Sequence, residues 1–233
     1  HLINLGSATG DDLVMSQKEI DHLMSEYNQS QIVCEEKIDG ANLGISLSGF
    51  DLKLLSQNRG HFVNIASHSQ FKKLDDWSNL HRDDLLKILF TDKQYPRRYI
   101  LFGEWLASSH SIAYTKLPDY FIAFDIYDRH HEQFLTRSSV QQRLKGTSIY
   151  QVPKLEIKIT SEMLKDKTAI QQLVQQQSLY TDGPIEGIYF RFLDGRCTKD
   201  RAKIVRSDFL ASTKHWTATI GRNNCILNKF HET

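Results

Sequence analysis

The stretch CEEKIDGAN, residues 34–42, lies between two short apolar runs at residues 31–34 and 43–47. Two such runs on either side of a glycine-containing turn predict two strands joined by that turn. A turn held by two strands can fix one side chain, here Lys37, at the floor of a cleft. A neutral lysine amine is a nucleophile, and partial burial or a nearby cation favours the neutral form. The stretch makes Lys37 a candidate nucleophile; the alternative is an ordinary hairpin with a surface lysine.

The composition is that of an ordinary globular protein. The chain has 233 residues, of which 40% are hydrophobic and 24% charged. No apolar run approaches the roughly 20 residues that a membrane-spanning helix needs, and we expect no signal peptide. The formal net charge is +1, so any affinity for nucleic acid must come from a local basic cluster.

The three cysteines, Cys34, Cys197 and Cys225, are scattered along the chain and form no Cys-x-x-Cys pair. This argues against a zinc site or a disulfide framework. We therefore expect an intracellular protein in a reducing compartment, the cytoplasm or the nucleus.

The pattern of apolar residues predicts more strands than helices. Helices are expected near residues 16–27, 74–90, 138–145 and 161–176, the first of them starting at a capping box formed by Ser16 and Glu19. Strands are expected near Lys37 and at residues 43–48, 51–57, 99–106, 119–128, 149–153, 185–192 and 202–205. Because helices interrupt the strands without regular alternation, we expect an α+β fold with antiparallel sheets.

Several charged residues end, follow or interrupt these apolar strands. They are Arg59, Glu104, Asp125, Glu186, Arg191 and Lys203. Each alone fits a solvated position, but charged groups are rarely buried without partners. Brought together, the cations would match phosphate oxygens, and the carboxylates would match a magnesium ion or ribose hydroxyls. Phe124 could stack on a base, although its spacing alone favours a place in the core.

Residues 36–40, Glu-Lys-Ile-Asp-Gly, resemble the first motif of the covalent nucleotidyltransferases, which include ATP-dependent ligases and mRNA capping enzymes. Later segments resemble the remaining motifs in family order, so the resemblance covers about residues 32–206. These segments are SQNRG at 56–60, FGEWL at 102–106, residues 120–125, EGIY at 186–189 and RAKIVR at 201–206.

Within that superfamily the chain most resembles RNA ligases of the phage double-strand-joining type and their nick-sealing bacterial relatives. The Gly-Glu-Trp-Leu segment, residues 110–114 and 117–120, and Lys-His-Trp at 214–216 carry this resemblance. It implies an ATP-grasp-like ligase adenylation fold, with central antiparallel sheets flanked by helices and a nucleotide cleft between the sheets. We expect one adenylyltransferase domain over residues 1–233, with an N-terminal loop and helix at 1–30 and a short tail at 207–233.

The resemblance also implies a three-step reaction. Lys37 attacks the α-phosphate of ATP and forms a lysyl-AMP, AMP moves to a 5′-phosphate end, and a 3′-OH displaces it to seal the strand. Each step is an in-line displacement at phosphorus, so positioning and charge stabilisation dominate catalysis. Mg²⁺ or Mn²⁺ is the implied metal.

Roles are carried over position by position. Glu36 would read the adenine edge and Phe124 would stack on its face, while Asn42 and Glu104 would hold the ribose or a metal-bound water. Arg59 would contact ribose and the 3′ end, Glu186 the metal through water, and Lys203 the α-phosphate. Asp39 is expected to act after the first step. Val205 stands where the phage pattern has a second lysine, and Arg206 is the candidate substitute and a candidate nucleic-acid contact.

The implied partners are RNA ends in a nicked duplex or an RNA/DNA hybrid, with a fused or separate end-healing module as a further partner. We expect a monomer that contacts no membrane. A DNA ligase or GTP-dependent capping enzyme is the alternative, although both carry an OB-fold domain for which the tail has no room. A nucleic-acid-binding scaffold with a degenerate ligase fold is the non-enzyme alternative, and Lys37, Glu104, Glu186 and Lys203 argue against it.

Overall fold

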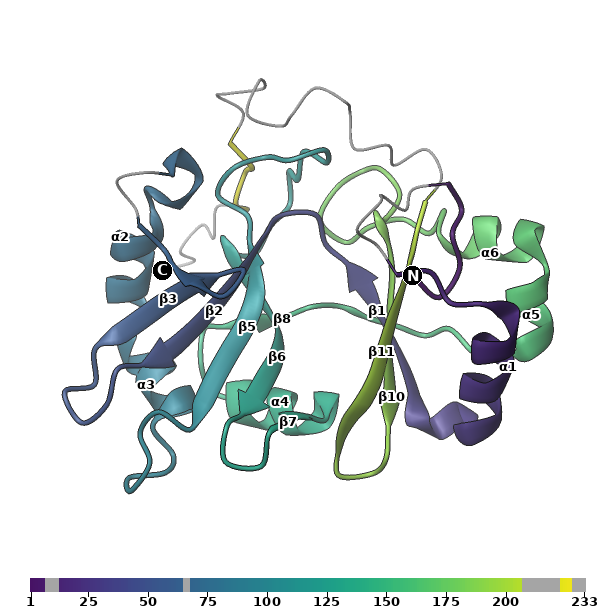
Figure 1. Ribbon diagram of the computed structural model, residues 1–233. Coiled ribbons are helices and arrows are strands. Elements are labelled where there is room, and N and C mark those ends of the chain that lie inside the picture. Colours follow the sequence, from purple (N-terminus) through teal and green to yellow (C-terminus); the bar gives the residue numbers. More distant parts are fainter. Residues whose placement is uncertain (7–12, 65–67, 207–222, 228–233) are drawn as a thin grey trace. The chain divides into compact units, whose positions relative to one another are not determined.

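A computed structural model describes residues 1–6, 13–64, 68–206 and 223–227 (Figure 1). The described residues form two compact units. Unit 1 contains residues 1–39, 110–113 and those from 152 to 206, and unit 2 contains residues 40–109, 114–151 and 223–227. The chain first passes from unit 1 to unit 2 between Asp39 and Gly40, so the stretch that carries Lys37 lies at this passage.

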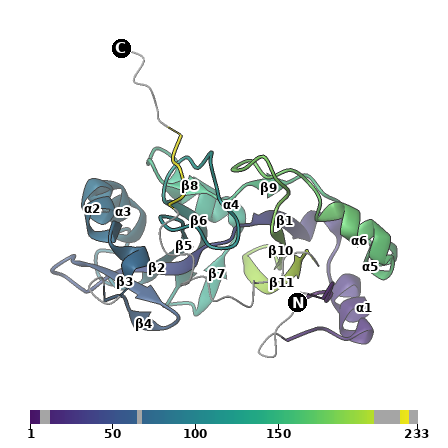
Figure 2. The ribbon, with the colours of Figure 1, turned by 90° about the horizontal axis from the view of Figure 1, so that it is seen from above.

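Unit 1 contains an antiparallel sheet with one helical face. Its strands are, in order across the sheet, β11 (Cys197–Val205), β10 (Gly187–Leu193), β1 (Ile32–Lys37) and β9 (Lys154–Leu155). Its helices are α1 (Gln17–Glu26), η1 (Gln29–Gln31), α5 (Ser161–Lys165) and α6 (Lys167–Leu173). Figures 1 and 2 show α1, α5 and α6 grouped beside these strands.

The two faces of the unit 1 sheet carry different kinds of side chain. Residues that point to the helices form the core, among them Cys34, Ile188, Phe190 and Ile204. Because successive strand residues point to opposite faces, Lys37 and Lys203 share the other face. The unit 1 sheet therefore buries one face in a hydrophobic core and leaves the second face for charged side chains.

Two predictions for unit 1 have clear outcomes. The capping box at the start of α1 is confirmed, because the Ser16 side chain accepts from Glu19 N and the Glu19 side chain accepts from Ser16 N. The single helix expected at residues 161–176 is wrong. Asp166 interrupts it, because its side chain accepts hydrogen bonds from Thr168 N and Ala169 N and so starts α6 as a new helix.

Unit 2 contains the remaining strands, which are antiparallel except for one short parallel pair. In order across the sheet its strands are β4 (His61–Phe62), β3 (Leu54–Asn58), β2 (Ala41–Leu47), β5 (Tyr99–Trp105), β6 (Phe121–Asp128) and β7 (Gln133–Leu135), with β8 (Tyr150–Gln151) parallel to β6. Its helices are η2 (Ser69–Phe71), α2 (Leu74–Leu80), α3 (Arg82–Leu89) and α4 (Arg137–Leu144). Figures 1 and 2 show α2 and α3 side by side in this unit.

The core of unit 2 lies between this sheet and its helices. It includes Leu43, Ile45, Trp77, Leu85 and Phe121. The single helix expected at residues 74–90 is wrong, because the chain turns at His81 between α2 and α3. The His81 side chain is held there by Asp119, 3.2 Å from its Nε2, and by Ser148, 2.8 Å from its Nδ1.

Two expectations about the strands near Lys37 differ in outcome. The hairpin expected from residues 43–48 and 51–57 is confirmed as the antiparallel pair β2 and β3. The strands on either side of the turn at residues 38–40 do not form a hairpin. Instead, β1 pairs with β9 and β10 in unit 1, and β2 pairs with β3 and β5 in unit 2. Each strand buries its apolar residues in a different core, so the turn separates two units.

The α+β class with antiparallel sheets flanked by helices is confirmed. All three cysteines are free thiols. Among the described residues, none of the helices is long and apolar enough to cross a membrane. The Lys-His-Trp segment at residues 214–216 and most of the expected tail lie outside the described residues.

Candidate functional site

Lys37 and Glu186 form an ion pair at the end of the unit 1 sheet. The antiparallel register of β1 and β10 places Lys37 opposite Gly187, so the residue before Gly187 is beside the lysine. Lys37 Nζ lies 2.5 Å from Glu186 Oε1. The lysine side chain is 25% exposed and the glutamate side chain 5%. The nucleophile candidate is therefore positioned by a buried carboxylate and is still reachable from solvent.

Gly187, which begins β10 beside this pair, is required for the close approach of β10 and β11. A Cβ built on Gly187 would lie 2.1 Å from the backbone oxygen of Ile204, and no side chain can occupy that space. Lys203 stands on the neighbouring strand, opposite Tyr189. Its positive charge stabilises the ionised form of Glu186. The sheet thus brings Lys37, Glu186 and Lys203 into one electrostatic group, as expected from the sequence.

Burial dominates the chemistry of Glu186. It raises the pKa of this carboxyl, while the cations of Lys37 and Lys203 oppose the rise and the charge of Asp39 adds to it. The second oxygen, Oε2, is buried and has no hydrogen-bond partner among the described residues. An unsatisfied buried carboxylate oxygen is costly, and a cation is the ligand that would satisfy it.

Asp39 is held by backbone amides of the short segment that returns to unit 1. Its Oδ2 accepts hydrogen bonds from Ser111 N at 2.7 Å and Ile112 N at 2.8 Å. Burial raises the pKa of this carboxyl, and the two amides and the Lys37 cation oppose that rise. Two backbone hydrogen bonds therefore hold the carboxylate of Asp39, which lies two residues after the nucleophile candidate.

Glu36 points away from Lys37 on the strand and is bound by a different segment. Its Oε1 accepts from Ser178 Oγ at 2.5 Å, and its Oε2 accepts from Leu179 N at 3.5 Å. Burial raises the pKa of Glu36, and both hydrogen bonds oppose this. The expected adenine-reading carboxylate is thus anchored by the residue 178–179 loop, a contact that the sequence did not predict.

A second buried ion pair supports the polar face of the unit 1 sheet. Arg191 Nε lies 2.6 Å from Glu35 Oε2, and both side chains are 1% exposed. Val33, Glu35 and Lys37 point to the same face of the sheet, because every second residue of a strand does so. Arg191 lies opposite Val33 on β10, so its side chain points to that face as well. Arg191 stands out in the sequence as a charge within an apolar strand, whereas its partner Glu35 does not.

His110 belongs to the same unit and was named from the sequence only as part of a motif. It is partly buried, and burial lowers the pKa of its imidazole, while the Glu186 charge opposes the fall. His110 precedes the two residues whose amides bind Asp39. It is therefore a further titratable group of the site in unit 1.

Unit 2 holds the expected residues Asn42, Glu104, Arg59 and Phe124. Asn42 and Glu104 are directly opposite each other on β2 and β5, and Glu104 Oε1 accepts from Gly40 N at 3.1 Å. Asn58 Nδ2 donates to the backbone oxygen of Asn42 at 2.5 Å. The sheet of unit 2 thus brings Asn42 and Glu104 together, as their proposed joint role requires.

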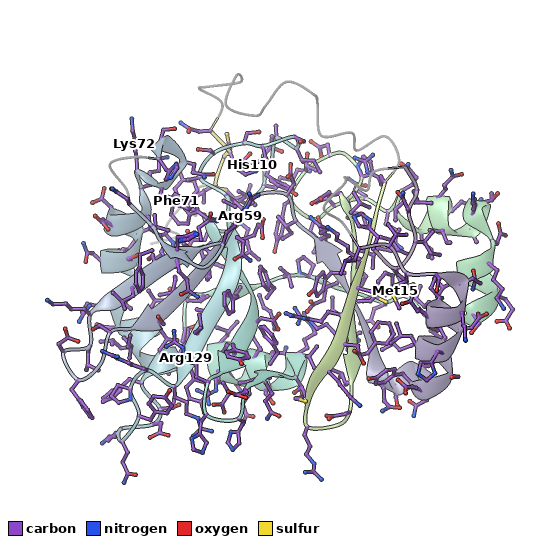
Figure 3. The ribbon with its side chains drawn as sticks, viewed as in Figure 1. Met15, Arg59, Phe71, Lys72, His110 and Arg129 are labelled. Carbon is purple, nitrogen blue, oxygen red and sulfur yellow. The ribbon has the colours of Figure 1, made fainter. Side chains whose placement is uncertain are left out.

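Arg59 and Phe124 owe their positions to irregular backbone. Arg59 has a positive φ of 48° in the turn after β3, and Figure 3 shows it at that end of the strands. The β5–β6 register jumps from Phe102 opposite Asp125 to Gly103 opposite Ala123, so Phe124 is the extra residue of a β-bulge. Phe124 is partly buried and lies outside the unit 2 core, so the core position that spacing favoured is wrong.

The described residues contain no group of three or more His, Cys, Asp or Glu side chains arranged to hold a metal ion. The site offers single carboxylates such as Glu186. It suits Mg²⁺ and Mn²⁺ bound with substrate, because Mg²⁺ keeps several waters and uses one or two carboxylates with phosphate oxygens. The unsatisfied Oε2 of Glu186 is the donor that fits such an ion.

Comparisons with known proteins show the family of this chain. The model of the RNA ligase family matches residues 30–205, more than half of the chain. No curated protein sequence matches. Among solved structures, a mutant of Naegleria gruberi RNA ligase with ATP and Mn has a TM-score of 0.58 and 21% identity, and covers 82% of this chain and 53% of that one.

A second structure, Naegleria gruberi RNA ligase with PPi, has a TM-score of 0.60 and 20% identity over 89% of this chain and 61% of that one. A third, a mutant of the same ligase with AMP and Mn, has a TM-score of 0.54 and 20% identity, with coverage of 88% and 59%. The chain thus spans between about half and three fifths of these neighbours. The likeness confirms the expected ligase fold, and the match over residues 30–205 shows that the chain belongs to the RNA ligase family.

Proposed function

We propose that this chain is an ATP-dependent RNA ligase in which Lys37 carries AMP before the strand is sealed. The observation that carries the proposal is the pairing of Lys37 Nζ with the buried Glu186 at 2.5 Å, beside Lys203, in a member of the RNA ligase family. A scaffold that only holds RNA has no use for a nucleophile and a buried carboxylate with an unsatisfied oxygen. The three solved neighbours contain ATP and Mn, PPi, and AMP and Mn, which supports nucleotide chemistry for this fold.

In the first step, Lys37 Nζ attacks the α-phosphorus of ATP. A nitrogen–phosphorus bond forms, the bond to the pyrophosphate oxygen breaks, and the amine loses a proton. Glu186 holds the amine in place, because its Oε1 is in hydrogen-bond contact with Nζ. Lys203 stabilises charge on the α-phosphate, as a lysine on the same face of the sheet can do.

Glu186 Oε2 would hold Mg²⁺ or Mn²⁺ directly or through a water. When bound, such an ion offsets the charge of the phosphates and helps pyrophosphate to leave. Asp39, fixed by Ser111 N and Ile112 N, acts after the first step, when AMP moves to the 5′-phosphate end and the 3′-OH attacks.

The two units together act as one adenylyltransferase domain. Unit 1 supplies Glu36 for the adenine edge. Unit 2 supplies Asn42 and Glu104 for the ribose or a metal-bound water, Phe124 for stacking on the base, and Arg59 for ribose and the 3′ end. The contact between Gly40 N and Glu104 and the bulge at Phe124 support these assignments, because both features fix a side chain that the family motifs mark. The backbone N–H of Arg206 donates to the backbone oxygen of Glu186 at 3.0 Å, so the two residues are neighbours. We assign Arg206 to contact with RNA.

The substrate is an RNA end with a 5′-phosphate and a 3′-OH, within a nicked duplex or an RNA/DNA hybrid. The protein acts as a monomer in RNA repair, in a reducing compartment that suits its three free cysteines. An end-healing module, fused or separate, prepares the ends.

Labelling with ATP tests this function. The protein is incubated with α-labelled ATP or GTP and Mg²⁺ or Mn²⁺, denatured, and examined for covalent label; joining of a nicked RNA duplex is then measured. We expect label from ATP, no label in Lys37→Ala, and label in the matched variant Lys154→Ala, whose amine pairs with exposed Glu156. Label from GTP alone would indicate a capping enzyme, sealing of DNA alone a DNA ligase, and RNA binding without label a scaffold.

A further inference from the structure

A hollow of about 420 Å³ lies in unit 2 at the end of β2 that is opposite to Asn42. Residues 46–48, at the end of β2, form one wall. The other walls are formed by Leu55 of β3, Phe62 of β4, Tyr95, Arg97 and Arg129. Figure 3 shows Arg129 at the other end of the unit 2 strands from Arg59. Ser46 is four residues along β2 from Asn42 and on the same face, a separation of about 13 Å. The hollow is therefore separate from Asn42, which we assign to the ribose of ATP.

Among the described residues, only backbone oxygens bind the side chains of two arginines of the hollow. Arg97 Nε donates to Ser48 O, and Arg129 Nη1 donates to Arg97 O at 2.6 Å. Within the described part of the chain, neither is ion-paired with a carboxylate. Most of their N–H donors remain available, and a guanidinium offers five in a fixed fork.

The neighbouring arginine has the opposite environment. Arg98 Nη2 lies 2.7 Å from Asp128 Oδ2, and its Nη1 lies 3.0 Å from Asp92 Oδ2. These nearby acids are thus committed to Arg98, and no acidic residue lines the hollow. An adjoining hollow of about 430 Å³ also contains Arg97 but includes Asp51, whose charge disfavours an anion. Of the two, the hollow with Arg129 is the better anion site.

The two cations disfavour each other in this setting. Arg129 is partly buried, and burial lowers the pKa of its guanidinium, with the positive charge of Arg97 adding to the fall. Placing an anion between two such groups removes the repulsion and supplies charge-assisted hydrogen bonds. A phosphate matches the fork of a guanidinium, and arginine is well suited to bind it.

The rest of the wall is apolar and aromatic. Phe62 is 70% exposed and Tyr95 is 37% exposed, and both line the hollow. Exposed aromatic rings beside arginines are the features with which proteins bind single-stranded nucleic acid, because rings stack on bases and cations bind the backbone. The volume also falls in the range of about 300–1,000 Å³ of small-ligand sites.

We propose that this hollow binds one nucleotide unit of an RNA strand, with its phosphate between Arg97 and Arg129 and its base against Phe62 or Tyr95. The choice of RNA rests on the proposed function, whereas the charge and the aromatic wall are features of the hollow itself. The site would increase affinity for the strand without taking part in lysine adenylylation.

The test compares RNA binding by the full chain and by Arg97→Gln/Arg129→Gln. A labelled single-stranded oligoribonucleotide is titrated at several salt concentrations, and fluorescence anisotropy gives Kd. We expect at least tenfold weaker binding at low salt. We also expect a slope of log K against log salt that is shallower by about 0.7, the change for one lost phosphate contact. Labelling by ATP should remain at the wild-type rate.

Lys93→Gln/Lys145→Gln is the matched control, because it removes the same charge from two exposed residues of unit 2 outside the hollow. It should retain RNA binding to within about twofold, and an equal loss in both double variants would overturn the proposal. Unchanged RNA affinity in the arginine variant would also overturn it, including the case where only binding of free AMP is weakened.

Phe62→Ser keeps the test decisive if the arginine variant does not fold. Its side chain is exposed, so its loss should not unfold the unit. It should weaken RNA binding several-fold without changing the salt slope, because it removes stacking and no charge; unchanged affinity would overturn the proposal. Failure of the ligase function has a different signature, which is absence of label in the wild-type protein.

Discussion

Lys37 and Glu186 come from strands that are far apart in the sequence, and antiparallel pairing of β1 with β10 places Nζ 2.5 Å from Oε1. The pair lies where the unit 1 sheet ends, and Gly187 allows β11, which carries Lys203, to approach β10 there. The amine that we assign as nucleophile and the carboxylate that we assign to the metal therefore position each other. Changing either residue should affect the first chemical step.

Glu186→Gln should slow lysine adenylylation by more than tenfold, equivalent to more than about 1.4 kcal/mol in activation free energy. The amide keeps the size of the side chain but removes the negative charge beside Lys37 and Lys203. Single-turnover labelling with ATP measures the rate. Glu156→Gln is the control, because this glutamate is 82% exposed; a wild-type rate in Glu186→Gln would remove Glu186 from the site.

Gly40→Ala should lower the free energy of unfolding by about 1–3 kcal/mol, the usual cost of overpacking. A Cβ at this position would lie 2.6 Å from Leu106 Cδ2, 2.8 Å from Trp105 O and 2.9 Å from Glu104 Cγ. Urea unfolding measures the change. Gly183→Ala has its nearest contact at 4.0 Å and should be close to neutral, so equal losses in the two variants would show that the clash is not the cause.

The buried pair of Glu35 and Arg191 should behave as a unit in a double-mutant cycle. Removing one partner, as in Glu35→Leu, leaves an uncompensated buried charge and should cost about 3–5 kcal/mol of unfolding free energy. Glu35→Leu/Arg191→Met removes both charges and should cost less than the single change. Additive losses in urea unfolding would mean that the 2.6 Å contact is not energetically coupled.

His110 should make stability depend on pH below neutrality. Burial lowers its pKa in the folded state, so the unfolded chain binds the proton more readily. Stability should therefore fall as pH decreases through the ordinary histidine value of about 6.5, by at most about 1.4 kcal/mol per pH unit for one proton. His110→Gln should lose less stability between pH 7.5 and 5.5, the endpoints of roughly one unit on either side of that value. Parallel curves for the two proteins would contradict the assignment.

Much of the secondary structure follows from local sequence, because capping boxes and apolar runs act over a few residues. The Ser16–Glu19 capping box sets the start of α1, and apolar runs set the strands β5, β6 and β10. Two long helices could not be predicted correctly, because His81 and Asp166 end them through contacts of their own side chains. Periodicity alone does not contain that information.

The separation at Asp39 and Gly40 also depends on distant residues. The sequences of β1 and β2 are those of a hairpin, but β1 pairs with β10 and β2 pairs with β5. In the candidate site, the family motifs pointed to Lys37, Glu186 and Lys203, which the structure groups in unit 1. They could not identify Ser178 beside Glu36 or Glu35 beside Arg191. These contacts join segments more than a hundred residues apart, and neither Ser178 nor Glu35 stands out in the sequence.

The most direct test of the central claim is to locate the adenylyl group after reaction with ATP. The wild-type protein is incubated with ATP and Mg²⁺ and digested, and the modified peptide is sequenced by mass spectrometry. We predict AMP on the peptide that contains Lys37, attached to that lysine, and none in Lys37→Arg. AMP on another residue, or an unchanged yield in Lys37→Arg, would contradict the account.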